Sequence, residues 1–596
     1  MNFRKESVIV ALLMVTFAGR AIAAPLPTRE IKLTGKLLLI PVGSRIAPDG
    51  TRNKGNNLRV SVDGVLVHNV GLMIAPTPEE VTFWGYLDMS EYVGGTAKLE
   101  VRGPVAEDAL ALFESSDKER YLKPLYTEIG RPQFHFSQKQ GWNNDVNGMV
   151  YYDGLYHLSW QCNPVGRSWG NMYWGHAVSR DLVHWDEWPR VLRAGGGATK
   201  EGRINDNIHR SMAIRQCFSG SACVDINNTL GKQKGDVKTL IACFTDTGSG
   251  LPRGPGEALA YSTDNGRTYT YLKDYNPLIS HKGRDPRLFW HQPSRHWVIV
   301  AYEQGTVVKE GGKKTIRGGK MGFYTSKDLK NWELAGYSDP LYHECPDFLE
   351  LPLDGDPGNK RWLLFDATPK YQIGTFDGKK FTAELKETRR TMGGAIKAAQ
   401  CFSNTKDGRA ICMVWARVKC GDDAPFSQGF TLPVDLTLKT AVDGPRVYAN
   451  PIKELDSLHG AELVSIKDKK LAAAGETISL KKQAQLLDIQ LTLKIEGNPE
   501  SVKLNFGADE VLYDYANKEF PRHNMKVFDK EDGKLEMRIF IDRPTVEVFA
   551  EGGSVYYLEG RRVLGELIKD ISLVVDGGSA TIENMKVYEM KSIWKK

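Results

Sequence analysis

Long apolar runs are scarce in this chain of 596 residues. The most apolar stretch, residues 8–19, is too short for a membrane-spanning helix. It follows Arg4 and Lys5 and precedes the small-residue pattern Ala21-Ile22-Ala23, an order typical of a secretory signal. We therefore predict a signal peptide over residues 1–24, a secreted or periplasmic protein, and no membrane span.

The chain also lacks an excess of charge of one sign. It has 79 Lys and Arg against 73 Asp and Glu, a net charge of +6, and no basic stripe along any segment. Nucleic-acid binding usually requires such a stripe, so we expect no nucleic-acid partner. Charge patterning says nothing about the oligomeric state, which stays open.

Cysteine is absent from both ends of the sequence. All eight cysteines lie between Cys162 and Cys420, with no CxxC spacing and no neighbouring histidine cluster. Zinc sites normally show such spacing, so we expect no metal and no cofactor. An exported chain permits disulfides, but eight cysteines allow too many pairings to name one, and several lie in apolar runs typical of buried thiols.

Glycine, proline and aromatic residues are plentiful, as in a turn-rich β protein: 59 Gly, 28 Pro and 10% aromatic residues. Apolar and polar residues alternate over residues 30–105, and Asp63-Gly64 between two such runs is a hairpin signal. We expect a β-sandwich-like module there. Residues 107–118 have helical character and are expected to form a linker.

Residues 125–440 contain a recurring unit. A strand-like run ends in Ser-x-Asp and is followed by a turn and an aromatic residue, at Ser179-Arg180-Asp181, Ser262-Thr263-Asp264 and Ser326-Lys327-Asp328. Repeated strand–turn–aromatic units are typical of a β-propeller, although a coincidence of common turn residues would look the same. Five blades would take roughly 63 residues each, more than the usual ~40–50, so we expect long inter-strand loops.

Alternation returns after residue 450, which predicts a second β-sandwich. The predicted fold is therefore all-β. Its expected divisions are a signal peptide (1–24), an N-terminal β-rich module with linker (25–125), a propeller (126–445) and a C-terminal β-sandwich (446–596).

Three acidic motifs precede or open strand-like runs in the central part. They hold Asp145 in Trp142-Asn143-Asn144-Asp145-Val146-Asn147-Gly148, Asp285 in Gly283-Arg284-Asp285-Pro286, and Glu344 in Tyr342-His343-Glu344-Cys345-Pro346. Taken singly, each could be a structural turn or a surface ion pair. Apolar neighbours raise a carboxyl pKa, so we expect a raised pKa for Glu344.

The three motifs together, in order and spacing, resemble those of glycoside hydrolase family 32, the invertase, inulinase and levanase group. Flanking segments agree with the same family: Trp160-Gln161-Cys162-Asn163-Pro164, the run 169–177, Phe218-Ser219-Gly220-Ser221 and the run 542–549. The resemblance covers residues 130–590 and implies a five-bladed propeller followed by a β-sandwich. Val146 and Cys162 depart from the usual family residues, Pro and Tyr.

The resemblance implies a catalytic role for each acid. Asp145 would be the nucleophile, Glu344 the general acid and then base, and Asp285 the transition-state stabiliser of a retaining mechanism. Further residues would hold the sugar: Trp142, Asn144, Gln161, Trp169, Phe218, Ser219, Arg284 and Trp415.

The implied activity is secreted β-fructofuranosidase action on a fructan, levan or inulin, with release of terminal fructose. A sucrose-preferring invertase and an endo-levanase are alternatives within the same class. A non-catalytic fructan-binding propeller is the alternative from another class, and it is disfavoured because all three acids are present.

Overall fold

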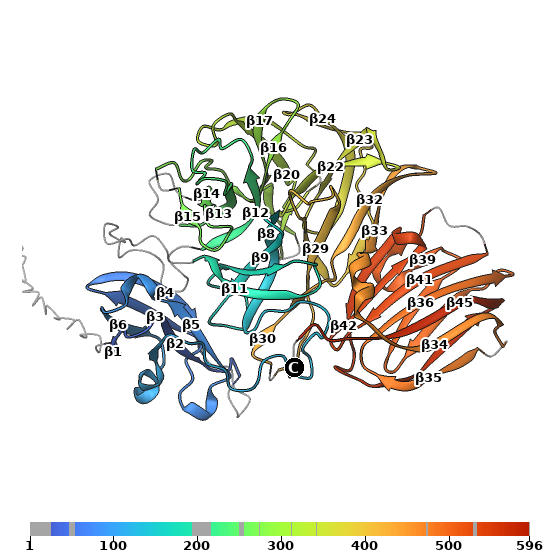
Figure 1. Cartoon of the computed structure of the whole chain (residues 1–596), viewed down its shortest axis with the longest axis horizontal. Coiled ribbons are helices and arrows are strands. Elements are labelled where there is room, and N and C mark those ends of the chain that lie inside the picture. The colour runs from blue at the N-terminus through green and yellow to red at the C-terminus, as the bar shows by residue number, and fades with distance from the viewer. Residues whose placement is uncertain are drawn as a thin grey trace, which may run out of the picture.

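The computed structural model describes residues 26–46, 54–193, 216–248, 255–272, 274–310, 313–340, 342–422, 424–472, 475–528 and 533–594. The predicted signal peptide lies outside these residues. Strands dominate throughout, and three β-rich units lie side by side (Figure 1). The expected all-β fold, a five-bladed propeller followed by a β-sandwich and preceded by a sandwich-like module, is confirmed.

The N-terminal module packs two antiparallel sheets, in the orders β1-β6-β3-β4 and β5-β2-β7. Alternate residues such as Leu58, Val60 and Leu99 are fully buried between the sheets, as the alternating sequence predicts. The elements are β1 Thr28–Lys32, β2 Leu37–Val42, β3 Asn56–Val62, β4 Val65–Leu72, η1 Pro78–Glu80, β5 Phe83–Asp88, η2 Ser90–Tyr92, β6 Thr96–Arg102, η3 Glu107–Leu112 and β7 Glu114–Ser116.

Two local predictions for this module have different outcomes. The Asp63-Gly64 hairpin is confirmed: Val62 pairs with Val65, and both turn residues have positive φ. The linker over 107–118 is wrong in part, because β7 pairs with β2 and so belongs to the module. The helical character is limited to the short 3-10 turn η3.

Blades I to III of the propeller each contain four antiparallel strands. Blade III carries an extra hairpin, β18–β19, which accounts for part of its length. The strands are β8 Gly141–Tyr152, β9 Leu155–Asn163, β10 Tyr173–Ser179 and β11 Trp185–Leu192; β12 Cys217–Asp225, β13 Thr239–Asp246, β14 Gly256–Ser262 and β15 Thr270–Tyr271; β16 Gly283–His291, β17 His296–Glu303, β18 Thr306–Glu310, β19 Lys313–Arg317, β20 Lys320–Ser326 and β21 Glu333–Tyr337.

Blades IV and V join into one ten-stranded sheet through a single parallel contact between Leu353 and Leu438. The predicted boundary at 445/446 lies inside the last strand of blade V. The strands are β22 Asp347–Leu353, β23 Asp356–Phe365, β24 Lys370–Phe376, β25 Phe381–Ala383 and β26 Arg389–Arg390; β28 Ile396–Cys401, β29 Ala410–Ala416, β31 Gly429–Phe430, β32 Val434–Ala441 and β33 Gly444–Pro451.

The inner strands of the five blades, β8, β12, β16, β22 and β28, form a ring. β8 lies beside β12 and β28, β12 lies beside β16, and β22 lies beside β28. The ring closes between β16 and β22, where Arg287 Nε lies 2.9 Å from Asp347 Oδ1. A late segment, β30 Phe426–Ser427, adds a parallel strand to β8 and ties blade V to blade I.

The recurring Ser-x-Asp unit forms the turn between the third and fourth strands of blades I, II and III. In blade III, Asp328 Oδ1 accepts the backbone N–H groups of Lys330 and Asn331 at 2.9 and 2.8 Å, and Ser326 Oγ accepts that of Leu329 at 3.0 Å. Blade I makes the same bonds through Ser179 and Asp181. The repeat is therefore a side-chain-capped turn.

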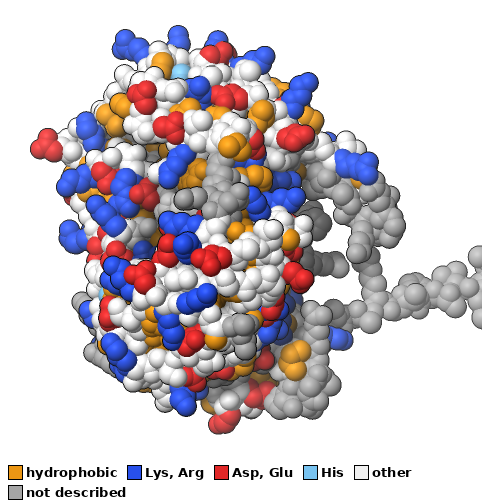
Figure 2. Space-filling view, turned by 90° about the vertical axis from the view of Figure 1, so that its right-hand side faces the viewer, with side chains coloured by type: hydrophobic (Ala, Val, Ile, Leu, Met, Phe, Trp, Pro, Cys, Tyr) orange, Lys and Arg blue, Asp and Glu red, His pale blue; other side chains and the backbone are white. Residues whose placement is uncertain are grey.

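The C-terminal unit packs a seven-stranded sheet, β27-β43-β42-β41-β36-β45-β34, on a six-stranded sheet, β35-β44-β37-β38-β39-β40. Lys and Arg side chains are interspersed with Asp and Glu side chains over the face turned to the viewer in Figure 2. The elements are β27 Met392–Gly394, η4 Lys453–Leu458, β34 His459–Lys470, β35 Glu476–Ala484, β36 Leu487–Glu496, β37 Ser501–Phe506, β38 Asp509–Asp514, β39 Glu519–Phe520, η5 Pro521–His523, β40 Met525–Lys526, β41 Lys534–Ile541, β42 Thr545–Ala550, η6 Glu551–Gly553, β43 Val555–Gly560, β44 Ile568–Asp576 and β45 Ser579–Met590.

A buried histidine joins the propeller to the C-terminal sandwich. His135, which precedes blade I, bonds through Nδ1 to Asp542 Oδ2 at 2.8 Å and through Nε2 to Glu547 Oε1 at 3.0 Å. Burial opposes protonation, but these two bonds outweigh it and raise the pKa of His135 from 6.5 to about 9. At neutral pH the joint is therefore a buried cation between two acidic side chains.

All eight cysteines lie in the described ranges, and none of them forms a disulfide. Seven are buried and Cys345 is half-buried. Among the described residues, no helix has the length and apolar character needed to cross a bilayer.

Candidate active site

The three predicted acids converge at the ends of the inner strands. Asp145 lies on β8, Asp285 on β16, and Glu344 just before β22. The thiol of Cys345 lies between the two aspartates, with Sγ 3.5 Å from Asp145 Oδ2 and 3.4 Å from Asp285 Oδ2. Residues up to 200 positions apart in sequence thus meet at one end of the propeller.

Asp145 is held by a hydroxyl from the neighbouring blade. Ser219 Oγ, on β12, donates to Asp145 Oδ2 at 2.7 Å. Burial and the charge of Glu344 raise the pKa of Asp145, and the bonds from Ser219 and Asn144 oppose that rise. The carboxylate is fixed on one side, and its pKa is responsive to the charge of the other acids.

Asp285 is the most enclosed of the three. Its N–H donates to Thr245 Oγ1 at 2.7 Å, and its Oδ2 accepts the N–H of Cys345 at 3.2 Å. Burial, then the charge of Glu344, holds the pKa of Asp285 well above its usual range, against the opposing effect of Arg284. Asp285 and Cys345 have φ of 65° and 50°, a left-handed conformation that costs non-glycine residues energy and tends to occur at functional sites.

Glu344 lies between two cations. Arg284 Nε donates to its Oε2 at 2.9 Å, and Lys397 Nζ bonds to its Oε1. Burial favours the neutral acid, but the charges of Arg284 and Lys397 outweigh it and lower the pKa of Glu344 to about 2. The expected raised pKa is therefore wrong for this arrangement, because the shell of Glu344 is cationic on two sides.

Lys397 is a site residue that the sequence did not reveal. It lies on β28 of blade V in the small apolar run Ala395-Ile396-Lys397-Ala398-Ala399, with no motif around it. Its register partner on β29 is Trp415. A lone lysine in the middle of an apolar inner strand was the available signal, since burying an ammonium group requires a partner.

Two predicted aromatic residues form one wall. The rings of Trp142 and Trp415 pack edge to face with centroids 6.2 Å apart, and Trp142 Nε1 donates to Asn144 Oδ1 at 3.0 Å. The indole N–H of Trp415 has no hydrogen-bond partner among the described residues. Because Asn144 also bonds to Asp145, this wall adjoins the acids.

A second aromatic pair adjoins Ser219 through its chain neighbour Phe218. Trp169 and Phe218 pack edge to face with centroids 6.1 Å apart. Trp169 is 47% exposed, so its ring presents a free face. Gln161 is different: it is buried, and its Nε2 donates to the Cys217 carbonyl at 2.9 Å, which joins blades I and II. The contacts found for Gln161 are therefore structural.

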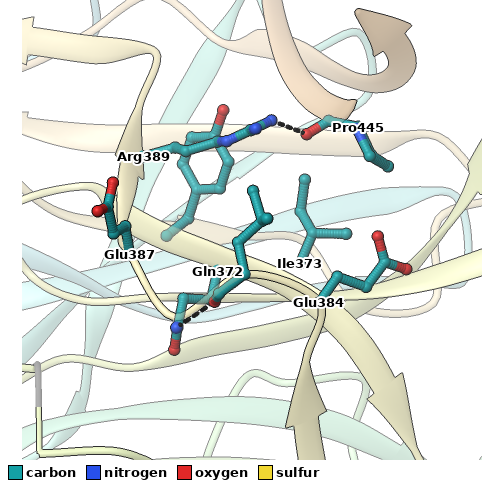
Figure 3. Close-up of a pocket in the computed structure, with 8 residues that line it drawn as sticks. Gln372, Ile373, Glu384, Glu387, Arg389 and Pro445 are labelled. Atoms are coloured by element: carbon teal, nitrogen blue, oxygen red, sulfur yellow. Dashed lines mark hydrogen bonds between the residues drawn. The ribbon is translucent and has the colours of Figure 1, made fainter. Parts of the chain in front are cut away.

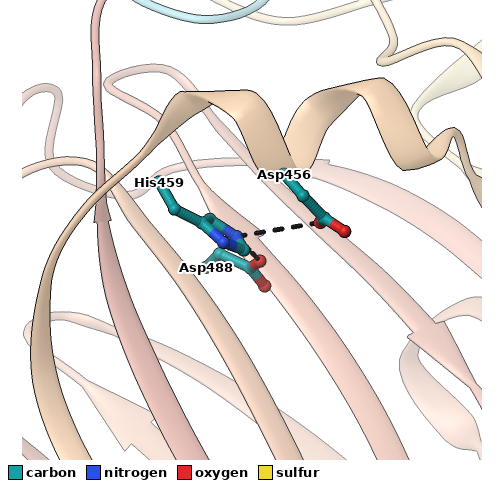
Figure 4. A group of neighbouring side chains, drawn as sticks. All are labelled: Asp456, His459 and Asp488. Carbon is teal, nitrogen blue, oxygen red and sulfur yellow. Dashed lines mark hydrogen bonds and ion pairs between the residues drawn. The ribbon is translucent and has the colours of Figure 1, made fainter.

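Two other features of the described residues do not resemble active sites. A cavity of about 10 Å³ in blade IV, in which Arg389 Nη1 donates to the Pro445 carbonyl, has room for about one water (Figure 3). Asp456, His459 and Asp488 offer metal-type ligand atoms within 4.8 Å of one another (Figure 4). Arg538 Nη2 lies 2.5 and 2.7 Å from the two carboxylates, so a guanidinium already occupies the cation position.

Comparison with known proteins places this geometry in a family. A model described as "Glycosyl hydrolases family 32 N-terminal domain" matches residues 135–451, more than half of the chain, and one described as "Glycosyl hydrolases family 32 C terminal" matches residues 454–589. The chain belongs to glycosyl hydrolase family 32. It is a glycoside hydrolase, and its N-terminal module lies outside both family-32 matches.

Individual family-32 relatives cover most of the chain. A levanase of Bacillus subtilis (strain 168) is 30% identical over 528 residues, which span 79% of this chain and 72% of the relative. An extracellular exo-inulinase of Aspergillus awamori is 28% identical over 79% of this chain and 96% of its own length. The crystal structure of exo-inulinase from that fungus matches 79% of this chain and 100% of its own, with a TM-score of 0.67 and 25% identity.

Proposed function

We propose that this protein is a retaining β-fructofuranosidase that releases terminal fructose from a fructan, levan or inulin. The cluster of Asp145, Asp285 and Glu344 with two cations is the observation that carries the proposal. The relatives' names, levanase and extracellular exo-inulinase, support the substrate class. They also support export, in line with the signal-like sequence over residues 1–24.

Each acid has a role in this proposal. Asp145 attacks the anomeric carbon of the fructosyl unit, and Glu344 protonates the departing oxygen and later activates water. Asp285 accepts hydrogen bonds from ring hydroxyls, and such bonds strengthen as the oxocarbenium-like transition state forms. The aromatic faces of Trp142 and Trp415 pack against the apolar side of the sugar.

Product analysis tests the substrate class. The purified protein is incubated separately with levan, inulin and sucrose, and the products are separated by size. We expect fructose as the main product from at least one polymer. Release of oligomers would indicate endo action, and inertness toward all three substrates would overturn the proposal.

Substitutions of Asp145 and Glu344 test the roles proposed for these two acids. Asp145→Asn should abolish turnover, and Glu344→Gln should lower kcat by ~10²–10⁴-fold, least for substrates with good leaving groups. Asp186→Asn, at an exposed position on β11, is the matched control and should keep full activity. Activity of Asp145→Asn equal to that of the control, with an unchanged circular dichroism spectrum, would remove Asp145 as the nucleophile.

A further inference from the structure

A large groove lies where the N-terminal module meets the propeller. It has a volume of about 910 Å³ and is lined on one side by module residues between Val42 and Gly103. The other side is formed by residues 163–171, from the end of β9 towards β10, and by Asp422. Typical small-molecule sites have volumes of ~300–1,000 Å³. The groove is therefore large enough for an oligosaccharide.

The two walls are fixed to each other. Gly71 N donates to Asn171 Oδ1 at 3.0 Å, and Asn171 Nδ2 donates to the Gly71 carbonyl at 2.6 Å. On blade I, the guanidinium of Arg190 lies 3.9 Å from the ring centroid of Tyr86. In Figure 1 the module lies against the propeller on the side of β11. A groove between firmly joined walls is organised before a ligand arrives, which reduces the entropy lost on binding.

The groove is linked to the acids through Trp169. Trp169 lines it with a half-exposed ring and packs edge to face on Phe218. The next residue, Ser219, bonds to Asp145. Two contacts and one peptide bond therefore connect the propeller wall of the groove to the proposed nucleophile.

The chemistry of the lining fits a neutral, hydroxyl-rich chain. Six glycines line the groove and add no side chains to it: Gly43, Gly55, Gly71, Gly103, Gly166 and Gly170. Asn57 lines the groove at 7% exposure, and its side-chain nitrogen has no partner among the described residues. Ile46, 53% exposed, and Met73 supply apolar surface.

Two of the three arginines that line the groove are paired within the protein. Arg167 donates to the Gly421 carbonyl at 2.8 Å and to the Asp422 carbonyl, and Arg102 Nε lies 3.8 Å from Glu100 Oε1. Arg167 and Arg102 are thus directed at partners within the protein, and the third arginine, Arg45, shares the groove with the acidic residue Asp422. An uncharged polysaccharide is thus favoured over a phosphate or sulfate ester.

We propose that this groove binds the part of the fructan chain that leaves with the departing oxygen, so that the N-terminal module selects polymer over sucrose. The proposal rests on the proposed β-fructofuranosidase function. It assigns a substrate-binding role to the module residues that line the groove, which lie outside the family matches.

Two variants and a control test the proposal. Ile46→Ala/Met73→Ala removes apolar surface from the module wall, and Asn57→Ala removes the unpartnered amide. Val93→Ala, 49% exposed on the same module and absent from the groove lining, is the control. We expect each groove variant to lower kcat/KM for levan or inulin about tenfold and to leave kcat/KM for sucrose unchanged, whereas the control changes neither.

The outcomes separate the two proposals. If the wild type is active and the groove variants lose kcat/KM equally on sucrose and polymer, or lose it on neither, the proposed role of the groove is overturned. The proposed β-fructosidase function would stay intact. A wild type inert on every β-fructoside would overturn both. Because Ile46 is exposed, Ile46→Ala alone provides a folded variant if the double variant is unstable.

Discussion

Lys397 and Arg284 determine the protonation state of Glu344 in the free protein. With both cations in contact, Glu344 is ionised at neutral pH, whereas a general acid must start protonated. Asp145 and Asp285, by contrast, have raised pKa values, since each is buried near the charge of Glu344. Titration of the site therefore belongs to the cluster as a whole.

Removal of Lys397 should change the pH profile. Lys397→Met deletes a cation beside a carboxylate, which destabilises the ionised form and raises the pKa of Glu344. The alkaline limb of kcat/KM should move to higher pH by about one unit or more. Lys419→Met, at an exposed position, is the control and should leave the profile in place. An unmoved limb in Lys397→Met would show that Lys397 does not set the charge of Glu344.

The site was only partly predictable from sequence for a physical reason. Asp145, Asp285 and Glu344 each lie in a local motif whose turn residues are readable along the chain. Lys397 reaches Glu344 only because blade V closes against blade IV, a contact with no local signature. Because the sequence does not reveal Lys397, it also predicts the wrong direction for the pKa shift of Glu344.

At the scale of elements, the Ser-x-Asp turns explain both the success and the limit of the propeller prediction. The Ser-x-Asp repeat predicts blades I to III from the sequence because the turns of these blades use serine and aspartate together. In blade IV, Asp377 accepts the N–H groups of Lys379 and Lys380 in the same role, but no serine stands two residues before it. The function of the turn persists while its sequence pattern is lost.

Loss of one such carboxylate should weaken a blade without affecting catalysis. Asp328→Ala leaves the N–H groups of Lys330 and Asn331 to water, so we expect about 1 kcal/mol of destabilisation in urea unfolding. Asp328→Asn keeps one acceptor oxygen and should lose less. Lys327→Ala, the exposed neighbour, is the control. Equal stability of all three variants would show that the carboxylate does not stabilise the turn.

For the whole molecule, the joint between the propeller and the sandwich depends on one proton. The pKa of His135 rises from 6.5 unfolded to about 9 folded, so its contribution is complete below about pH 6.5 and is lost as the pH rises through 9. The shift corresponds to about 3 kcal/mol. His281, raised to about 10 by Glu257 and Glu303 despite its burial, has the same sign.

A comparison of variants isolates this joint. The melting temperature of the wild type should fall between pH 7 and pH 9.5, and His135→Gln should start lower and fall less over the same interval. His281 is present in both proteins, so its contribution cancels in the comparison. Parallel pH curves for the two proteins would contradict the assignment of the proton to His135.

The last described residues return to the start of the propeller. Trp594 stacks on Tyr126 with ring centroids 3.8 Å apart, and Ile593 N donates to the Gln133 carbonyl at 2.8 Å. Ribosomes make a protein from its N-terminus, so the segment joining the first module to blade I is covered only after the propeller and the C-terminal sandwich have been synthesised. A chain truncated before residue 593 would keep every acid of the site. It would leave the segment around Tyr126 and Gln133 uncovered, and that segment would then be exposed to proteases.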